Sequence, residues 1–437
     1  MSATFTEVHE GEMVRSRVRA HAFSLATLLV LVGTPAILIA APLWFGATHL
    51  SASVVLVAAS WLLFLVWLAQ GIRNGKLPLT THPVLLPAVL LLAFTSVHWA
   101  MGISANVPAT QMEWLRWTGY LALALAAAET FSTPGSLRWL AATLACAGAA
   151  IAVMGIAQHL TGEGKIYWII EPSQGGWVFG PYVNRNHFAG LMELWIPLAL
   201  GMALAPDARF LRRWAWCGAA LVMAAAVVMA ASRGGLLAVA VEVAVLVMAT
   251  AALHGRRRAV LGLVVSVALL AGFIWLVGSA DVLQRFTQMA QPGATTMGEV
   301  SGHRLEAWAG SLKIFRENWL LGTGLDTFET YFRSVRLYYT DKVWTHAHND
   351  FLQFVAETGV VGMALGLWLL VAATREIIRN LRRTAQTATG AILIGVACGC
   401  LGFMVHGWLD FNFHVPANAA SFAVLAAIAS RRGWDED

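Results

Sequence analysis

A short segment rich in histidine, asparagine and aspartate ends the longest polar stretch of the sequence. It reads Trp344-Thr-His-Ala-His-Asn-Asp350 and leads directly into a long apolar run. A free imidazole has a pKa of about 6.5, so His348 can accept a proton from a hydroxyl group near neutral pH. The segment therefore predicts a general base at the start of a helix. The plainer interpretation is a capping cluster, in which Asn349 or Asp350 only begins the helix.

A polar stripe continues from this segment into the apolar run. Asp350, Gln353 and Glu357 are spaced three and four residues apart, so they lie on one face of a helix. Polar side chains inside a membrane are costly unless they face the interior of a helix bundle. We therefore expect this stripe to point inward, and we take Asn349 and Glu357 as weaker candidates for substrate binding.

Two arginines are placed where they can bind an anion. Arg233 lies in the turn Ser232-Arg-Gly-Gly235 between two apolar runs, and Arg304 lies in Gly302-His-Arg-Leu-Glu306. A guanidinium group donates two parallel hydrogen bonds to a phosphate, and a pyrophosphate has room for two such groups. The pair predicts a pyrophosphate site. The alternatives are an arginine that reaches from a helix end to the membrane surface and an ordinary solvated ion pair.

A fourth cluster, Gly180-Pro-Tyr-Val-Asn-Arg-Asn-His187, directly precedes another apolar run. Its polar side chains suit sugar hydroxyls or phosphate, whereas an asparagine cap followed by a turn is an equally good interpretation. The weaker substrate-binding candidates from this cluster are Asn184, Arg185, Asn186 and His187.

The composition identifies the environment in which these clusters must work. Hydrophobic residues make up 58% of the 437 residues and charged residues only 12%, which is more apolar surface than a soluble core of this size can bury. Long apolar runs without alternation predict membrane-spanning helices. The net charge of +5 comes from bases in short loops, so it reports topology and not nucleic acid. The four cysteines lie in apolar runs without metal-ligand spacing.

The apolar runs predict an all-α integral membrane protein with about twelve transmembrane helices. The runs are 23–46, 53–72, 83–101, 115–132, 138–158, 187–205, 213–231, 234–253, 259–279, 352–374, 388–409 and 413–430.

Most of the 29 Lys and Arg residues fall in alternate loops, which places those loops and both termini in the cytoplasm. Two long segments, 159–186 and 280–351, then lie outside, the second between spans 9 and 10. Loops of this length are usually functional. Within the second, residues 304–315 have the spacing of an amphipathic helix at the membrane surface, with Leu305, Trp308, Leu312 and Phe315 on its apolar face. We expect residues 1–437 to form one membrane domain, with the two outer segments at the mouth of the active site.

Several of these residues together resemble the signature of the O-antigen ligase and polymerase superfamily, over about residues 175–430 of this chain. The residues that carry the resemblance are Ser232-Arg233-Gly234, Arg304, Gly322-Thr-Gly324, His348-Asn349, Leu352, Glu357, Gly359 and Gly362.

The resemblance implies a metal-independent, inverting glycosyltransferase with a GT-C-like fold and no cofactor. Such enzymes of the bacterial inner membrane move a glycan from undecaprenyl pyrophosphate to an acceptor hydroxyl at the periplasmic face. His348 is then the base that activates the acceptor, and Arg233 and Arg304 hold the pyrophosphate. The acceptor is a growing polysaccharide in polymerases, the lipid A core of lipopolysaccharide in ligases, or a protein hydroxyl. The long outer segment has seven Lys and Arg against eight Asp and Glu, which slightly favours a polymerase over a phosphorylated acceptor.

Two other function classes fit parts of the sequence. A secondary transporter would use Glu193, Glu242 and Asp410 as ion or proton sites, but the chain lacks the matching halves typical of that class. A membrane hydrolase would use His346, His348 and Asp350 as metal ligands, which one bound zinc per chain would reveal.

Overall fold

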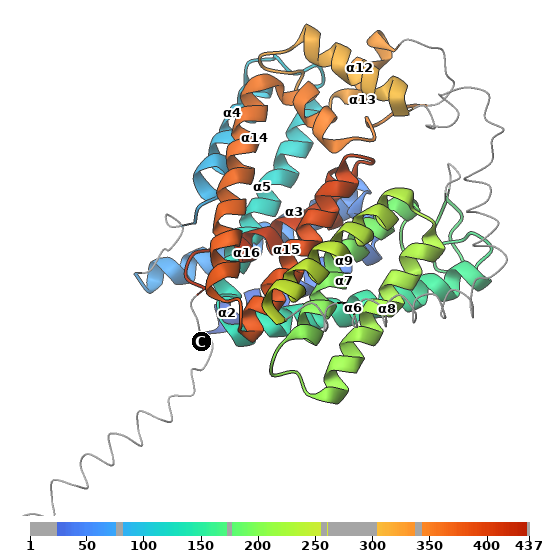
Figure 1. Cartoon of the computed structure of the whole chain (residues 1–437). Coiled ribbons are helices and arrows are strands. Elements are labelled where there is room, and N and C mark those ends of the chain that lie inside the picture. Colours follow the sequence, from blue (N-terminus) through green and yellow to red (C-terminus); the bar gives the residue numbers. More distant parts are fainter. Residues whose placement is uncertain are drawn as a thin grey trace, which may run out of the picture.

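The structure, a computed structural model, is all-helical and describes residues 24–75, 82–172, 177–254, 260, 304–336 and 343–434 (Figure 1). Its elements are α2 (Leu25–Leu43), η1 (Phe45–Ala47), α3 (Leu50–Arg73), α4 (Leu85–Ala100), α5 (Val107–Thr130), α6 (Pro134–Thr161), α7 (Arg185–Leu204), α8 (Phe210–Ala230), α9 (Arg233–His254), α12 (Arg304–Glu317), α13 (Phe328–Val335), α14 (Asp350–Arg383), α15 (Ala388–Gly407), η3 (Asn412–His414) and α16 (Pro416–Ser430).

Eight helices of the described chain are long and apolar enough to cross a membrane, namely α2, α3, α6, α7, α8, α9, α14 and α15. Helices α4 and α16 are apolar but shorter. The described residues are therefore helical, as predicted, and their long apolar helices are consistent with an integral membrane protein. Helix α5 occupies a predicted span without meeting the same criterion, because its first half carries the ion pair Glu113–Arg116. The predicted run 259–279 lies outside the described residues, and the count of about twelve spans stays a prediction.

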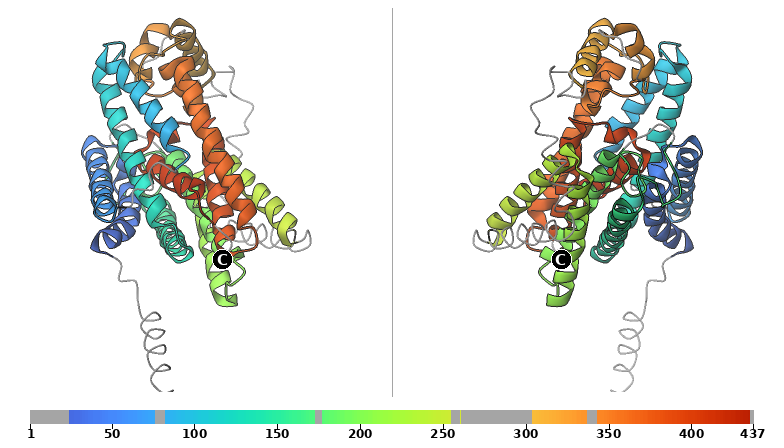
Figure 2. Two further views of the ribbon diagram at one scale, coloured as in Figure 1. Left: turned by 90° about the vertical axis from the view of Figure 1, so that its left-hand side faces the viewer. Right: turned by 90° about the vertical axis from the view of Figure 1, so that its right-hand side faces the viewer.

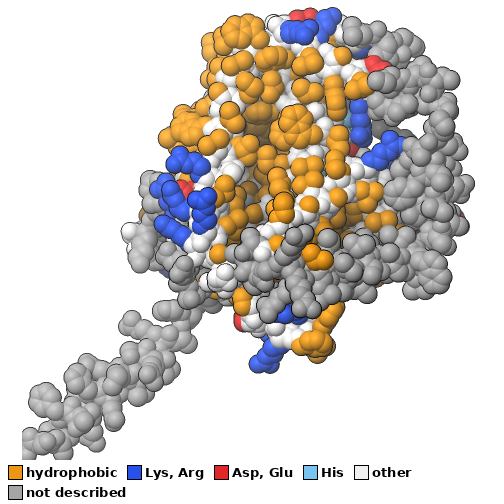
Figure 3. Space-filling view, viewed as in Figure 1, with side chains coloured by type: hydrophobic (Ala, Val, Ile, Leu, Met, Phe, Trp, Pro, Cys, Tyr) orange, Lys and Arg blue, Asp and Glu red, His pale blue; other side chains and the backbone are white. Residues whose placement is uncertain are grey.

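Figure 3 shows how this composition appears on one face of the molecule. Hydrophobic side chains cover most of that face, and Lys and Arg gather toward its edges. On helix α14, Leu367, Trp368 and Val371 are all exposed. An exposed apolar surface of this extent is expected where lipid replaces water as the solvent.

Helix α7 forms the core of the bundle and packs against α15, α8 and α6. Small residues bring α7 and α15 unusually close, since a Cβ atom added at Gly395 would lie 2.2 Å from the carbonyl oxygen of Pro197. Small residues at helix crossings are what allow such approach in membranes. The pair holds two polar segments together at one end of the bundle, residues 184–187 at the start of α7 and Asp410 just after α15.

The outer segment folds over this same end of the bundle. Helices α12 and α13 lie across the end of α14, as both views in Figure 2 show. The predicted helix from residue 304 is confirmed, and α12 extends it to Glu317. It buries Ala307 and Ile314 against the protein and leaves Leu305 and Leu312 exposed. The other two residues predicted for the same apolar face turn toward the protein, because Trp308 Nε1 donates to the His348 carbonyl at 3.4 Å and Phe315 packs against the buried hydrophobic cluster that includes side chains of α13. The predicted apolar face is therefore divided between the outer surface and the protein interior.

Helix α14 is interrupted at Gly359, where φ is 62° and ψ is −165°. The backbone that follows α12 runs against this break, and the Val360 N–H donates to the carbonyl of Trp319 at 2.8 Å. A Cβ atom at Gly359 would lie 2.5 Å from the carbonyl of Leu320, so only glycine permits both the backbone angles and the approach. The first two turns of α14 are thereby joined to the segment that precedes α13.

Candidate active site

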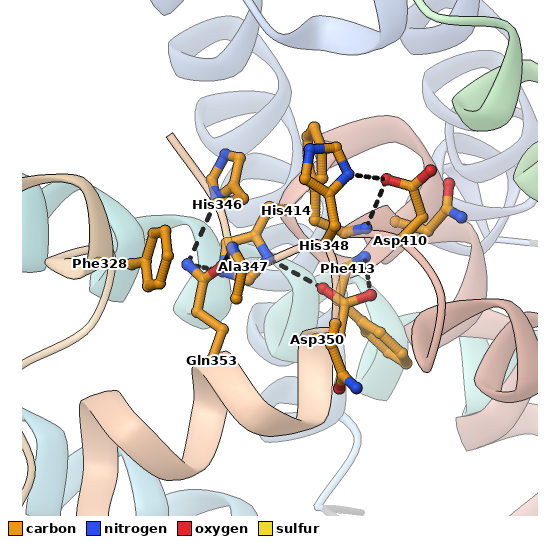
Figure 4. Close-up of polar contacts among 12 residues, drawn as sticks. Phe328, His346, Ala347, His348, Asp350, Gln353, Asp410, Phe413 and His414 are labelled. Carbon is orange, nitrogen blue, oxygen red and sulfur yellow. Dashed lines mark hydrogen bonds and ion pairs between the residues drawn. The ribbon is translucent and has the colours of Figure 1, made fainter. Parts of the chain in front are cut away.

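The carboxylate of Asp410 is the centre of the site, in the turn between α15 and η3. Its side chain is only 1% exposed, and donors from three other segments surround it (Figure 4). His348 Nδ1 lies 3.1 Å from Oδ1, Arg304 Nη2 lies 3.5 Å from Oδ2, and Asn186 Nδ2 donates to Oδ2. One carboxylate therefore joins the segment before α14, the first residue of α12 and the first turn of α7.

Asp410 remains ionised at neutral pH. Burial raises its pKa, but the hydrogen bond from His348 and the positive charge of Arg304 outweigh burial and hold the pKa well below its usual range. A buried carboxylate is tolerated when it is paired and hydrogen-bonded in this way. Asp410 thus supplies a fixed negative charge beside the imidazole of His348.

The position of His348 suits a general base. Because Nδ1 faces the carboxylate of Asp410, the Nδ1 proton is the one donated there, and Nε2 keeps its lone pair. The His348 side chain is 27% exposed, so solvent or a substrate can reach it. Its ring contacts Phe411 and Trp344 edge-on, at centroid distances of 4.8 and 5.6 Å, and its backbone has a left-handed φ of 50°. These contacts fix the ring in one orientation.

The polar stripe of α14 faces the interior, as its spacing predicts. Asn349 is the N-cap of the helix and accepts from the Leu352 N–H at 3.0 Å, while Asp350, Gln353 and Glu357 are all buried. Glu357 accepts the backbone N–H groups of Asp326 and Phe328 at 2.8 and 3.0 Å. Asn349 and Glu357 therefore hold the loop and helix that surround the site.

A second histidine–carboxylate pair lies beside the first. His414 Nδ1 is 2.9 Å from Asp350 Oδ1, and Gln353 Nε2 lies 3.1 Å from His414 Nε2 and 3.3 Å from His346 Nδ1 (Figure 4). Burial lowers the pKa of His414, but the hydrogen bond and charge of Asp350 raise it to about 9. Burial and the charge of His414 keep the pKa of His346 well below its usual value. His414 is therefore a cation and His346 is neutral at pH 7.

The pair predicts a pH dependence of stability. The folded-state pKa of His414 lies above its unfolded value of about 6.5. The stabilisation of the fold by charged His414 is therefore complete below pH 6.5 and is lost as the pH rises through about 9. In detergent, the wild-type Tm should fall between pH 6 and pH 9.5 by on the order of 2 °C more than that of His414→Gln. Parallel Tm curves for the two proteins would contradict the charge assigned to His414.

Residues 184–187, around the start of α7, also reach the site. Asn184 caps α7, and its Nδ2 lies 3.4 Å from His187 Nε2. The His187 ring meets the Phe411 ring at 4.7 Å, and Asn186 bonds Asp410. The guanidinium of Arg185 lies 4.4 Å above the ring of Trp177. Asn186 and His187 are thus brought together with His348, whereas the guanidinium of Arg185 contacts the aromatic ring of Trp177.

Arg233 is the exposed first residue of α9, at the same end of the bundle. The next residue, Gly234, packs so closely on His406 that an added Cβ atom would lie 2.4 Å from the imidazole. The carbonyl of His406 accepts the backbone N–H of Asp410 at 3.0 Å. Of the two arginines predicted to bind pyrophosphate, Arg304 contacts the carboxylate of Asp410. Arg233 begins helix α9, which packs against His406, the residue whose carbonyl bonds the backbone of Asp410.

Most residues of the two rival functions have other partners here. His346, His348 and Asp350 face Gln353, Asp410 and His414 respectively, and within the described residues no group of three or more His, Cys, Asp or Glu is arranged to hold a metal. Of the residues proposed for a transporter, Glu193 bonds His406 at 2.8 Å in the bundle core. Both oxygens of Glu242 are buried without a hydrogen-bond partner in the described chain.

The sequence does not predict Asp410 or His414 as members of a glycosyltransferase site; it suggests Asp410 only for a transporter and His414 only as a further ligand of a metal site. Both lie in the short segment Asp410-Phe-Asn-Phe-His414 between two apolar runs, on the side of the membrane predicted for the other clusters. A carboxylate and an imidazole in one such turn are the signal that identifies it.

A comparison with family models agrees with the resemblance seen in the sequence. Residues 218–367 match the O-antigen ligase family (Wzy_C). The match includes Arg233, Arg304 and His348, while Asn186 and Asp410 lie outside it. No curated protein matches the chain at a significant level. Membership of the O-antigen ligase superfamily is thus supported by the segment that carries the predicted base and both predicted arginines.

Proposed function

We propose that this membrane protein, which carries an O-antigen ligase domain, is an inverting, metal-independent glycosyltransferase. It would move a glycan from undecaprenyl pyrophosphate to an acceptor hydroxyl at the periplasmic face of a bacterial inner membrane. The observation that supports this most directly is that His348 and Arg304 bind the same buried carboxylate, Asp410. A base for a hydroxyl group and a cation for a phosphate group therefore lie side by side.

The proposed reaction is a single displacement at the anomeric carbon of the donor. Nε2 of His348 removes the proton of the acceptor hydroxyl while its oxygen attacks the face opposite the leaving group. The bond from the anomeric carbon to the pyrophosphate oxygen breaks, and the electron pair leaves with the pyrophosphate, which inverts the configuration. Asp410 keeps His348 in the required tautomer and stabilises the imidazolium that forms.

Arginine side chains supply the positive charge that the leaving group requires. The Arg304 side chain is 31% exposed and places one N–H group 3.5 Å from Asp410; within the described residues its other donors remain for a phosphate. Fixed cations at the position where negative charge develops lower the barrier. We assign the second cation to Arg233, which begins α9 at the same end of the bundle.

The arginines are tested by their effect on donor use. Arg304→Ala and Arg233→Ala should each lower kcat/KM for the lipid-pyrophosphate donor by about 10²-fold, because each removes a cation from the leaving group. Arg304→Lys should recover only part of the loss, since an ammonium group lacks the two parallel donors. Arg316→Ala, on the exposed last turn of α12, is the matched control and should behave as wild type. Wild-type donor kinetics in Arg304→Ala would remove that residue from the site.

The sidedness of the site is a further part of the proposal. We place both termini in the cytoplasm and α12 and α13 in the periplasm, within a single domain of residues 1–437. In a cysteine-free background, a membrane-impermeant maleimide should label Glu317→Cys in intact spheroplasts. Arg383→Cys, exposed at the far end of α14, should react only after permeabilisation. The reverse labelling pattern would place the site on the wrong side of the membrane for this function.

The size distribution of the reaction products identifies the class of acceptor. We favour a polysaccharide polymerase over attachment to lipid A core or to a protein hydroxyl. Purified protein in liposomes with the lipid-linked oligosaccharide alone should yield a ladder of products, each one repeat longer. A single mobility shift that requires added lipid A core would indicate a ligase instead. No consumption of the donor with any acceptor would refute the glycosyltransferase proposal itself.

A further inference from the structure

A polar cavity of about 460 Å³ lies between the start of α5, helix α13 and the segment that precedes His348. Its lining residues are Asn106, Ala109, Asp326, Glu329, Thr330, Arg333, Thr345 and His346. We infer that this cavity binds the acceptor glycan and that it selects a sugar without phosphate groups. This inference rests on the glycosyltransferase function proposed above. Its volume falls within the range of about 300 to 1,000 Å³ typical of sites for small ligands.

The cavity wall offers neutral hydrogen-bonding groups from three separate elements. Asn106 is the N-cap of α5, Thr330 lies on α13, and Thr345 lies on the segment before α14. Asn106 Nδ2 lies 3.1 Å from Thr330 Oγ1, which joins the two helices across the cavity rim. Amide and hydroxyl groups both donate and accept, so they match the hydroxyl groups of a sugar.

The charges in the cavity do not suit an anion. Of the lining residues that the structure describes, Arg333 alone carries a fixed positive charge, and it is paired with Glu329 one turn away on α13. His346 is neutral because burial lowers its pKa. Asp326 adds a carboxylate, so the lining as a whole repels phosphate and accepts hydroxyl or amine donors.

Asp326 is held in a conformation that requires support. Its φ is 57°, in the left-handed region, and its N–H donates to Glu357 Oε2 at 2.8 Å. Within the described residues no group donates a hydrogen bond to its carboxylate, and burial raises its pKa to about 6. Backbone strain that the surrounding structure maintains is common at functional sites. Glu357 is thus a positioning residue that holds Asp326 at the cavity wall.

The cavity lies close to the base. The His346 ring, which lines the cavity, stacks on Phe411 at a centroid distance of 4.4 Å, and the His348 ring contacts the same phenyl ring at 4.8 Å. Figure 4 shows the two imidazoles above the start of α14. One aromatic ring therefore separates the cavity from His348. A glycan seated in the cavity can direct a terminal hydroxyl past Phe411 to Nε2 of His348.

The first test fills the cavity without removing a polar group. Ala109→Trp should raise the KM for the acceptor by about tenfold or more and leave the KM for the lipid-pyrophosphate donor unchanged. Gln111→Trp places the same bulk on an exposed position of α5 and should match wild type in both constants. Equal acceptor KM values for the two variants would overturn the cavity assignment.

The second test addresses the phosphate. One acceptor glycolipid is supplied with and without its sugar phosphates to the reconstituted full-length protein. The kcat/KM of the wild type should be about tenfold higher for the phosphate-free form. Asp326→Asn should reduce this ratio, because it removes a negative charge that repels the sugar phosphates. A preference for the phosphorylated form would overturn the substrate class. Absence of transfer by wild type to either form would instead count against the proposed function as a whole.

Discussion

Replacement of His348 by alanine should lower the rate of glycan transfer by about 10²- to 10⁴-fold, because the acceptor hydroxyl then loses its general base. The KM for the lipid-pyrophosphate donor should change little, since the imidazole contacts the acceptor side of the reaction. The measurement is a transfer assay with purified variant in liposomes, at saturating donor.

The control for this experiment is to show that the variants remain folded. His348→Ala and His348→Gln should elute as wild type from size exclusion and should keep the donor KM, because Asp410 retains its bonds to Arg304 and Asn186. Transfer within tenfold of the wild-type rate by either well-folded variant would mean that His348 is not the base.

The Asp410→Asn variant should lose about as much activity as His348→Ala, although the substitution changes few atoms. An asparagine amide can donate to Nδ1 of His348, which favours the tautomer with the proton on Nε2, where the lone pair is needed. By analogy with the same change in a Ser-His-Asp triad, the expected fall in kcat is about 10⁴-fold. Asp410→Glu keeps the charge and should recover part of the activity.

A purely structural role for Asp410 predicts a different result. In that case Asp410→Asn would lower Tm and activity together, and the pH profile of the remaining activity would match wild type. A change in the tautomer instead lowers kcat with a Tm close to wild type. A wild-type kcat in a folded Asp410→Asn variant would contradict the proposed pairing.

The sequence is sufficient to predict the local features of this fold. The spacing of Asp350, Gln353 and Glu357 predicts an inward-facing stripe, and the spacing after Arg304 predicts α12, because both depend only on residues within a few turns of one helix. The apolar runs likewise predict where the helices lie. The number of spans is harder to predict, because α5 combines polar residues such as Glu113 with extensive burial against α3 and α16.

The pairing within the site is not predictable from spacing. Asp410 is separated by 62 residues from His348, by 106 from Arg304 and by 224 from Asn186, so the contacts depend on how the helices pack. The same limit applies to the cavity, whose walls come from α5, α13 and the segment before α14. Local sequence indicates which side chains are costly to bury, and only packing shows which of them meet.

The break in α14 at Gly359 has a consequence for the lipids around the protein. Bilayers differ in thickness, and a helix that is long for its membrane responds by tilting or kinking. The part of α14 beyond Gly359 spans the apolar region, while the turns before it are fastened to the loop after α12. We expect a change in tilt to be absorbed at Gly359, so that the catalytic groups keep their spacing as acyl chains lengthen or shorten. Gly359→Ala should therefore make activity depend more strongly on lipid chain length than it does in the wild type.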